Sequence, residues 1–410
     1  MRIAVDASVC FNRRGFGRFA RELLAALAAR RDGFEYVLLL DREPRPGELP
    51  DALASLERVA ARPGRRVTDA AAAGDRRSVR DLLAFTRAAR RARAGLLFLP
   101  AVWSAFPLWP GTRAVICFHD TIAEEHPRLV FPDRRSELLW RAKCWLAARQ
   151  ATRVMTVSQA SRAAVSRAYR IPAERIDVVT EGADPRFRPL SDRAAVLRGI
   201  ARFLAREGPP YFLFVGGLSP HKNLRTLLAA MRSLLERRDA RLLLAGDPAA
   251  DGFLGSGSEL RTQVEGDARL RDRVAFTGFV GDDDLVFLLN GAAALVLPSL
   301  LEGFGLPALE AMACGTPVLA SSRGALPEVV GDAGLLFDPT DPEAMARAMQ
   351  RLLDEPELRE RLACRAVERA GRFSWARGAE LAAASFARAL ELGPALSSAP
   401  PAAGAPSGTR

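Results

Sequence analysis

Residues 298–318 read Pro298-Ser-Leu-Leu-Glu302-Gly303-Phe304-Gly305-Leu306-Pro307-Ala-Leu-Glu310-Ala-Met-Ala-Cys-Gly315-Thr-Pro317-Val318. They predict the end of a buried strand at about Ser299, then a glycine-rich loop, then a helix. Pro307 suits the first turn of that helix, and Gly315 suits its end. The loop therefore leads directly into a helix N-terminus, where free backbone N–H groups can bind a phosphate or sugar oxygen.

Two carboxylates flank this loop. Glu302 lies before the helix and Glu310 in its first turns, so they can address different parts of one long ligand, and carboxylates accept hydrogen bonds from sugar hydroxyls. Gly303 and Gly305 let the backbone approach such a ligand closely. The residues alone leave an alternative open, in which Glu302 is an ordinary loop acid and Glu310 complements the helix dipole.

Short apolar runs alternate with longer amphipathic stretches on both sides of this segment. The runs of the first half are Ile3–Val5, Tyr36–Leu40, Leu96–Leu99, Ala114–Phe118, Val154–Val157 and Ile176–Val179. The runs of the second half are Tyr211–Val215, Arg241–Ala245, Val274–Thr277, Ala294–Leu297, Val318–Ala320 and Leu335–Phe337. Such runs are typical of parallel strands covered on both faces, so we expect an α/β protein with two tandem doubly wound, Rossmann-like domains.

The domain boundary is expected in the proline-punctuated, charged segment 184–210. We assign residues 1–190 to the first domain and 205–374 to the second, and we expect residues 393–410, rich in Ala, Pro, Ser and Gly, to be a disordered tail. A length of 410 residues and a charged content of 26% fit two globular domains.

The net charge of +11 is unevenly distributed. Residues 1–200 hold 36 Lys+Arg and 22 Asp+Glu, a difference of +14, whereas residues 201–410 hold 23 and 26, a difference of −3. An anionic partner should therefore meet the first half. No basic motif interleaved with aromatic residues accompanies the excess, so no nucleic-acid partner is expected.

Five widely spaced cysteines and a start that predicts a strand favour a reduced, cytoplasmic protein without a secretory signal. Two uncharged stretches, Gly95–Thr112 and Leu285–Leu301, are interrupted by prolines or by an Asn-Gly turn, which argues against membrane spans.

The segment that contains Glu302 and Glu310 resembles the Glu-x7-Glu signature of the family 4 retaining glycosyltransferases, or group 1 glycosyltransferases, which have the GT-B fold. Residues 324–334, Gly-Ala-Leu-Pro-Glu-Val-Val-Gly-Asp-Ala-Gly, are also typical of that family. The resemblance implies that Glu302 contacts the donor sugar, that Glu310 binds the nucleotide ribose, and that the backbone of Phe304-Gly305-Leu306 lies against sugar and phosphate. It also implies that a last helix, 375–392, packs back on the first domain, which takes the acceptor.

A Gly-Gly turn and a lysine open the second domain, in Phe214-Val-Gly216-Gly217-Leu-Ser219-Pro220-His221-Lys222-Asn223-Leu224. A cation and free amides before a helix suit a diphosphate. The resemblance implies that Lys222, with the amides of Gly216 and Gly217, neutralises the leaving diphosphate. Gly217 stands where the family usually has an arginine, so Arg225 or a residue of the first domain would supply a second cation.

A glycine loop follows the first strand, in Arg13-Arg14-Gly15-Phe16-Gly17-Arg18-Phe19-Ala20. It also fits a dinucleotide-binding pattern with Asp41 after the next strand, which raises an NAD-dependent oxidoreductase as an alternative. About eight residues separate Asp6 from Gly15, which is too many for that pattern. The resemblance implies instead that Gly15 and Gly17 lie near the donor phosphates and Arg18 near donor or acceptor.

Polar residues end several strands, at the edge where open α/β sheets bind ligands. The resemblance implies that His119 approaches the reacting sugar and that the nucleobase lies on the backbone at Phe279-Val280. The remaining candidates for the cleft and the acceptor are Asp120, Ser158, Glu181 and Gly182. Asp282-Asp283-Asp284 begins a predicted helix, so capping explains it better than a metal site, and no catalytic metal is expected.

The resemblance thus implies a retaining hexosyltransferase without a cofactor, which catalyses with Glu302, His119 and Lys222. GDP-mannose is the first donor expected, a UDP-sugar the next, and the acceptor is a glycan or a polyprenyl-diphosphate-linked glycan of cell-surface polysaccharide synthesis. A GT-B sugar-nucleotide epimerase is a further alternative. The arginine excess of the first domain suggests peripheral contact with an anionic membrane, on its cytoplasmic face.

Overall fold

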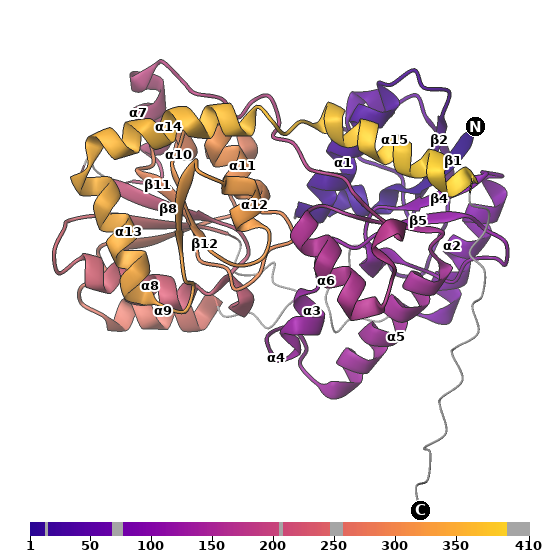
Figure 1. The fold of residues 1–410 in the computed structure, drawn as a ribbon, viewed down its shortest axis with the longest axis horizontal. Helices are drawn as coiled ribbons and strands as arrows, with labels where there is room; N and C mark the ends of the chain where they lie inside the picture. The colour runs from indigo at the N-terminus through magenta and orange to yellow at the C-terminus, as the bar shows by residue number, and fades with distance from the viewer. Residues whose placement is uncertain (13–14, 68–76, 205–207, 247–256, 392–410) are drawn as a thin grey trace, which may run out of the picture.

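A computed structural model describes residues 1–12, 15–67, 77–204, 208–246 and 257–391. Arg13 and Arg14 of the glycine loop and the expected tail 393–410 lie outside the described residues. Figure 1 shows two α/β units side by side, with helices on both faces of each sheet.

The first sheet is parallel throughout, in the order β3-β2-β1-β4-β5-β6-β7. Its strands are β1 (Arg2–Asp6), β2 (Glu35–Leu40), β3 (Glu57–Ala60), β4 (Leu96–Leu99), β5 (Ala114–Cys117), β6 (Arg153–Thr156) and β7 (Ile176–Val178). Residues of β4, β5 and β6 are buried along their whole length, which explains the continuous apolar runs of β4 and β5.

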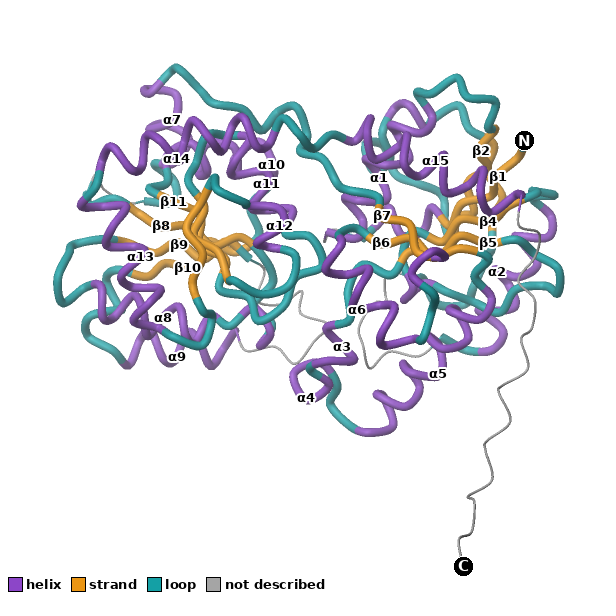
Figure 2. Tube along the Cα trace, viewed as in Figure 1, coloured by secondary structure: helices purple, strands orange, loops and turns teal. Residues whose placement is uncertain are grey.

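The second sheet is also parallel, in the order β10-β9-β8-β11-β12-β13. Its strands are β8 (Tyr211–Val215), β9 (Arg241–Ala245), β10 (Val274–Gly278), β11 (Ala294–Leu297), β12 (Val318–Ser321) and β13 (Gly334–Phe337). In both sheets the chain order reverses beside the first strand, which is the doubly wound arrangement. The predicted α/β class with two Rossmann-like domains is therefore confirmed (Figure 2).

One strand was absent from the sequence prediction. β3 lies at the edge of the first sheet, and its sequence Glu-Arg-Val-Ala has two exposed and two half-buried residues. An edge strand that is half exposed needs no apolar run, so the criterion that identified the other strands could not detect it.

The helices connect the strands in both domains. In the first domain they are α1 (Gly15–Ala28), α2 (Val79–Arg91), α3 (Ile122–Glu125), α4 (Pro127–Val130), α5 (Arg134–Gln150) and α6 (Gln159–Tyr169). Those that follow are α7 (Arg193–Ile200), α8 (Leu224–Leu234), α9 (Gly257–Gly266), α10 (Asp282–Gly291), α11 (Leu306–Ala313), α12 (Leu326–Val330), α13 (Pro342–Asp354), α14 (Pro356–Ala370) and α15 (Trp375–Glu391). Short 3-10 turns include η1 (Ala7–Phe11), η4 (Val102–Ser104) and η6 (Pro220–Lys222).

The last helix, α15, leaves the second domain and packs on the first, against α1 and the first sheet (Figure 1). Phe386 is fully buried there, with its ring centroid 5.1 Å from that of Phe98. Ser385 Oγ donates to Asp177 Oδ2 over 2.7 Å, and Arg388 donates to Asp177 Oδ1 over 2.8 Å. The chain thus crosses between the domains a second time, after residue 371.

Within the described parts of the chain, no helix combines the length and the apolar character needed to cross a bilayer. All five cysteines are free thiols, and only Cys364 is exposed.

Candidate functional site

The two domains touch at Gly303, in the loop between β11 and α11. Ser158 Oγ donates to the Gly303 carbonyl over 2.7 Å, and Ser161 Oγ donates to the same oxygen over 3.0 Å. A Cβ atom on Gly303 would lie 2.4 Å from the backbone oxygen of His119. Gly303 is therefore a glycine because the backbone of the other domain passes against it.

Glu302 pairs with Lys222 beside this contact. Lys222 Nζ lies 2.7 Å from Glu302 Oε1, which also accepts a hydrogen bond from Ser299 Oγ over 2.6 Å. Burial opposes the charged form of Glu302, but Lys222 and Ser299 outweigh it, so the pKa of this carboxyl lies below its ordinary value. Glu302 is held as an anion, and Lys222 faces it as a cation.

Asn223 holds the turn that presents Lys222. Its backbone is left-handed, with a φ of 60°, and it precedes α8. Its Nδ2 donates to the carbonyl oxygens of Pro298 (3.0 Å) and Pro339 (2.7 Å), the first of which follows β11. Sequence reasoning missed this residue, although an asparagine directly before a helix is a signal for a special backbone conformation.

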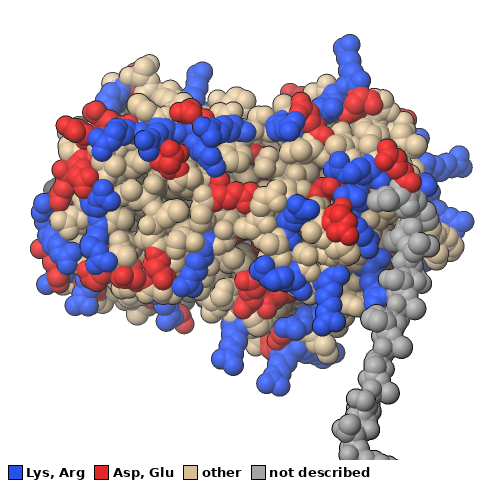
Figure 3. Space-filling model, in the orientation of Figure 1, with Lys and Arg blue, Asp and Glu red and all other residues tan. Residues whose placement is uncertain are grey.

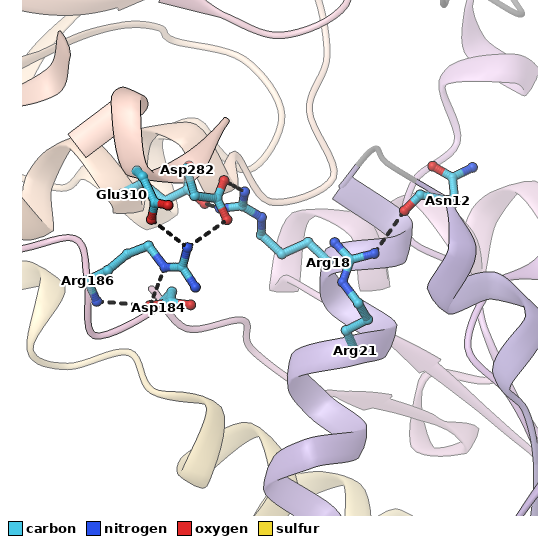
Figure 4. Close-up of polar contacts among 8 residues, drawn as sticks. Asn12, Arg18, Arg21, Asp184, Arg186, Asp282 and Glu310 are labelled. Atoms are coloured by element: carbon cyan, nitrogen blue, oxygen red, sulfur yellow. Dashed lines mark hydrogen bonds and ion pairs between the residues drawn. The ribbon is translucent and has the colours of Figure 1, made fainter. Parts of the chain in front are cut away.

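Glu310 is buried and pairs with Arg18, a residue of the other domain. Arg18 extends from α1 and forms ion pairs with both Glu310 and Asp282, which begins α10 (Figure 4). Burial favours the neutral acid, and together with the Asp282 charge it raises the pKa of Glu310 to about 7 in spite of Arg18. Glu310, the predicted ribose ligand, thus also links the two domains through its ion pair with Arg18.

His119 is buried between two phenylalanines of α1. Its ring centroid lies 4.9 Å from that of Phe16 and 4.6 Å from that of Phe19. Its Nε2 lies 2.8 Å from the Pro100 carbonyl oxygen, which can only accept, so Nε2 carries the proton and Nδ1 is the acceptor. Burial lowers the pKa of His119 to about 4, so the ring is neutral at pH 7.

Two further carboxyls, Asp120 and Glu181, lie at the same edge of the first sheet. Burial raises the pKa of Asp120 to about 6 and that of Glu181 to about 8. The charge of Glu310 adds to the effect on Glu181, and Arg18 opposes it. Glu181, Glu310 and Arg18 therefore form one electrostatic group that spans both domains.

Family models match most of the chain in two consecutive blocks. Residues 13–187 match "Glycosyltransferase Family 4" and residues 200–369 match "Glycosyl transferases group 1". The O-antigen chain mannosyltransferase B of Escherichia coli is 35% identical over 272 residues, which cover 64% of this chain and 67% of that protein. The chain belongs to the group 1, family 4 glycosyltransferases.

Other relatives of this glycosyltransferase are named for different substrates. The D-inositol 3-phosphate glycosyltransferase of Frankia alni is 36% identical, over 58% of this chain and 59% of that protein. Among solved structures, the sucrose-phosphate synthase of Thermosynechococcus elongatus superposes with a TM-score of 0.73 at 22% identity, over 95% of this chain and 98% of that one. HepE of Anabaena, solved with UDP and glucose, superposes with a TM-score of 0.71 at 20% sequence identity, over 94% of this chain and 99% of that one. These two structures support the fold.

The glycine loop of the glycosyltransferase shows two different reasons for glycine. Gly15 is the first residue of α1, and a Cβ there would meet nothing within 4 Å. A Cβ on Gly17 would lie 1.8 Å from the Asn12 carbonyl oxygen, so Gly17 lets α1 pack on the preceding loop. In a dinucleotide fingerprint the helix follows the first strand directly, whereas here the turn η1 separates β1 from α1. The comparisons give the oxidoreductase and epimerase alternatives no support.

Other candidate residues lie around this centre. Gly216 and Gly217 follow β8, and Gly216 lies beside the Lys222 side chain. Gly305, with a φ of 100°, precedes α11, whose first residue is the buried Leu306, while the buried Phe304 ring packs on Phe373. The last candidates are Phe279, which is exposed after β10, the half-buried Val280, Ser158, which caps α6, and Gly182, whose backbone lies against Ser374 and Trp375.

The three aspartates at the start of α10 are engaged by arginines. Asp282 pairs with Arg18, Asp283 with Arg186 over 3.2 Å, and Asp284 with Arg202. Across the described residues, no group of three or more His, Cys, Asp or Glu side chains has an arrangement that could hold a metal ion. Sequence reasoning assigned these aspartates to helix capping, but the N-cap residue of α10 is Gly281, and the aspartates form the first turn after it. It also missed the pairing of Asp282 with the other domain.

Proposed function

We propose that this glycosyltransferase moves a sugar, with mannose as the first candidate, from a nucleotide-sugar donor to a glycan or lipid-linked acceptor, with retention of configuration. The observation that carries the proposal is a pair of acids on either side of the start of α11, the half-buried Glu302 and the buried Glu310, each with a cationic partner. A nucleotide sugar offers hydroxyls to both acids and a diphosphate to the cations between them.

The diphosphate is the group that must be stabilised as it leaves. In this proposal the diphosphate binds to Lys222, to the backbone amides of Gly216 and Gly217 and to the N-terminus of α11; Gly216 lies beside the Lys222 side chain, and Lys222 bonds to Glu302 shortly before α11. Preorganised charges of this kind lower a barrier because they need not rearrange as negative charge develops. Since Lys222 is already fixed by Glu302 and by the turn that Asn223 anchors, its placement requires little ordering when the donor binds.

A second cation for the diphosphate is supplied by Arg18. Of the two candidates raised by the sequence, Arg225 has a side chain that is 68% exposed and pairs with Glu259, on the outside of the second domain. The Arg18 side chain is 19% exposed and sits on Glu310. When ribose hydroxyls bind Glu310, the guanidinium loses that partner, and from its remaining contact with Asp282 it can turn toward the neighbouring diphosphate.

The sugar is oriented by Glu302 and His119. Neutral His119 offers Nδ1 as an acceptor for a sugar hydroxyl, and Glu302 offers a carboxylate. The bond between the anomeric carbon and the phosphate oxygen breaks, and the acceptor oxygen bonds to that carbon on the same face. The acceptor proton passes to the leaving phosphate, so no protein nucleophile is needed.

The names of the relatives support the proposed donor and acceptor. GDP-mannose is proposed first, because two relatives are named as mannosyltransferases of E. coli, at 35% and 30% identity. A UDP-sugar comes next, because a structural neighbour was solved with UDP-glucose. The O-antigen name of the first relative supports a glycan or polyprenyl-diphosphate-linked acceptor in polysaccharide synthesis.

A panel of nucleotide sugars in a thermal-shift assay tests the proposal. We expect one of GDP-mannose, UDP-glucose and UDP-galactose to raise the melting temperature of the protein, and Glu310→Gln to remove most of that shift. The same assay with NAD should give no shift. A shift with NAD alone would contradict the proposal.

A further inference from the structure

Helix α5 has an outer face that is unusual for a helix exposed to water. Leu138, Leu139, Trp145 and Leu146 are exposed large apolar residues, and Leu138 and Trp145 are 68% and 56% exposed. The inner face contains Ser136, Trp140, Cys144 and Ala147, at the i, i+4, i+8, i+11 spacing of a packed stripe. The helix therefore presents apolar residues on both sides, of which only one is used by the core.

Arginines are interleaved with these apolar residues. Arg134, Arg135, Arg141 and Arg149 are exposed on the same helix. The single acid of the helix, Glu137, pairs with Arg141 over 2.8 Å, so four arginines and one acid leave a net charge of +3 on this surface. The Arg149 guanidinium stacks on Trp145 at 4.6 Å from the ring centroid. Figure 3 shows basic side chains projecting from the corresponding lower edge of the first domain.

We infer that the outer face of α5 docks on the surface of an anionic lipid bilayer. Trp and Leu side chains on a helix that also carries arginines enter the boundary between headgroups and acyl chains, while the arginines reach the lipid phosphates. Charge complementarity favours this partner over a second copy of the chain, because two such faces would bring arginines against arginines.

The docked surface adjoins the site described above. Trp140, on the inner face of α5, packs with Leu301 on a small apolar cluster formed by Ile122, Ala123, Val130 and Phe131. Leu301 directly precedes Glu302, and α4 contacts the η6 turn that carries Lys222. A bilayer on α5 would therefore place lipid phosphates near the entrance to the site. The use of this arrangement for a lipid-linked acceptor rests on the proposed function, whereas the docking does not.

Vesicle flotation with the full chain tests the inference. We expect binding to vesicles of phosphatidylcholine with 30% phosphatidylglycerol, weak binding to phosphatidylcholine alone, and loss of binding in high salt. Arg134→Gln with Arg135→Gln should weaken binding by roughly fivefold for each arginine removed. Leu138→Ser with Leu139→Ser should also weaken it, and both variants should keep the wild-type rate of donor consumption with a water-soluble acceptor.

Matched substitutions elsewhere control for general loss of charge or apolar surface. Arg359→Gln with Arg361→Gln removes two exposed arginines of α14, and Val79→Ser with Leu197→Ser removes two exposed aliphatic residues. Both controls should bind vesicles like the wild type. Wild-type binding that ignores lipid charge, or α5 variants that bind normally, would overturn the inference, as would a dimer in light scattering that the α5 variants dissociate. Vesicle binding without any donor consumption would leave the inference standing and sink the proposed function.

Discussion

Arg18 in the first domain and Glu310 in the second form an ion pair, although 292 residues separate them in the chain. The same guanidinium also binds Asp282, so one side chain contacts two helices of the other domain, at the start of α10 and in the middle of α11. Because Glu310 is the expected ribose ligand, donor binding and the contact between the domains use the same carboxylate. On the proposed function, sugar-nucleotide binding and domain arrangement would be coupled through this residue.

Replacing Arg18 by Gln should lower kcat by about 100-fold, the usual effect of losing one group that stabilises developing negative charge. Arg18→Lys should recover part of the rate, since it keeps the charge and loses the two-pronged geometry. Steady-state kinetics on the preferred donor measure both. Arg225→Gln, on the outside of the second domain, is the control and should be near normal. Equal losses at the two positions would refute the assignment of the second cation.

Lys222→Ala should lower kcat by about 100-fold or more, because it removes the cation proposed to face the diphosphate and leaves the half-buried Glu302 without its cationic partner. Lys222→Arg separates the two effects, since it keeps a charge for Glu302. Circular dichroism checks that each variant is folded. A folded Lys222→Ala protein with near-normal turnover would show that the lysine has no role in catalysis.

Gly303→Ala should weaken the contact between the domains. The added methyl would lie 2.4 Å from the His119 carbonyl oxygen, and overpacking of this kind costs about 1 to 3 kcal/mol. We expect a lower kcat/KM and faster proteolysis between the domains, with little change within each domain. Gly266→Ala, where a methyl meets nothing within 4 Å, is the matched control. If the two variants behave alike, the close approach is unimportant.

The stability of the protein should fall as the pH rises from 6.5 to 8. Burial raises the pKa of Glu181 from 4.5 to about 8, so the folded state holds a proton that the unfolded state has released. This contribution is complete below pH 4.5 and is lost as the pH approaches 8, at about 1.4 kcal/mol per pH unit at most. Glu310 acts in the same direction up to pH 7, and His119, whose pKa is lowered, acts in the opposite direction only below pH 6.5.

Urea denaturation of wild type and Glu181→Gln at pH 6.5 and 8 measures this effect. The amide cannot ionise, so the variant should lose less stability over the interval than the wild type does. Glu174→Gln, on the exposed turn before β7, should keep the wild-type slope. A Glu181→Gln protein with that same slope would mean that Glu181 is ionised in the fold.

The parts of the fold that sequence predicts are those with a local cause. Continuous apolar runs identify β4 and β5 because both faces of these strands are buried, and the same criterion fails for β3 at the sheet edge. The helix that begins at Asp282 follows from its acidic first turn. The pairing of Asp282 with Arg18 has no local signal, because it depends on how two separately folded sheets face each other.

In the candidate site, too, the sequence predicts the features with a local cause and not the contacts between distant residues. The loop from Glu302 to Glu310 is recognisable because a strand, glycines and a helix follow one another within a few residues. The anchoring of Lys222 through Asn223 and the approach of Gly303 to His119 are tertiary contacts, and the residue types alone allow many other partners. Sequence therefore proposes the site residues, and their partners come from the structure.

The central claim is transfer from a nucleotide sugar with retention, and NMR of the reaction mixture tests it most directly. The protein is incubated with GDP-mannose or a UDP-sugar and an oligosaccharide acceptor, and the anomeric signals are followed from the first minutes. We predict that one donor is consumed, that the first anomer formed keeps the configuration of the donor, and that Lys222→Ala leaves the donor intact. A first-formed anomer of inverted configuration, or no consumption of any donor, would contradict the account.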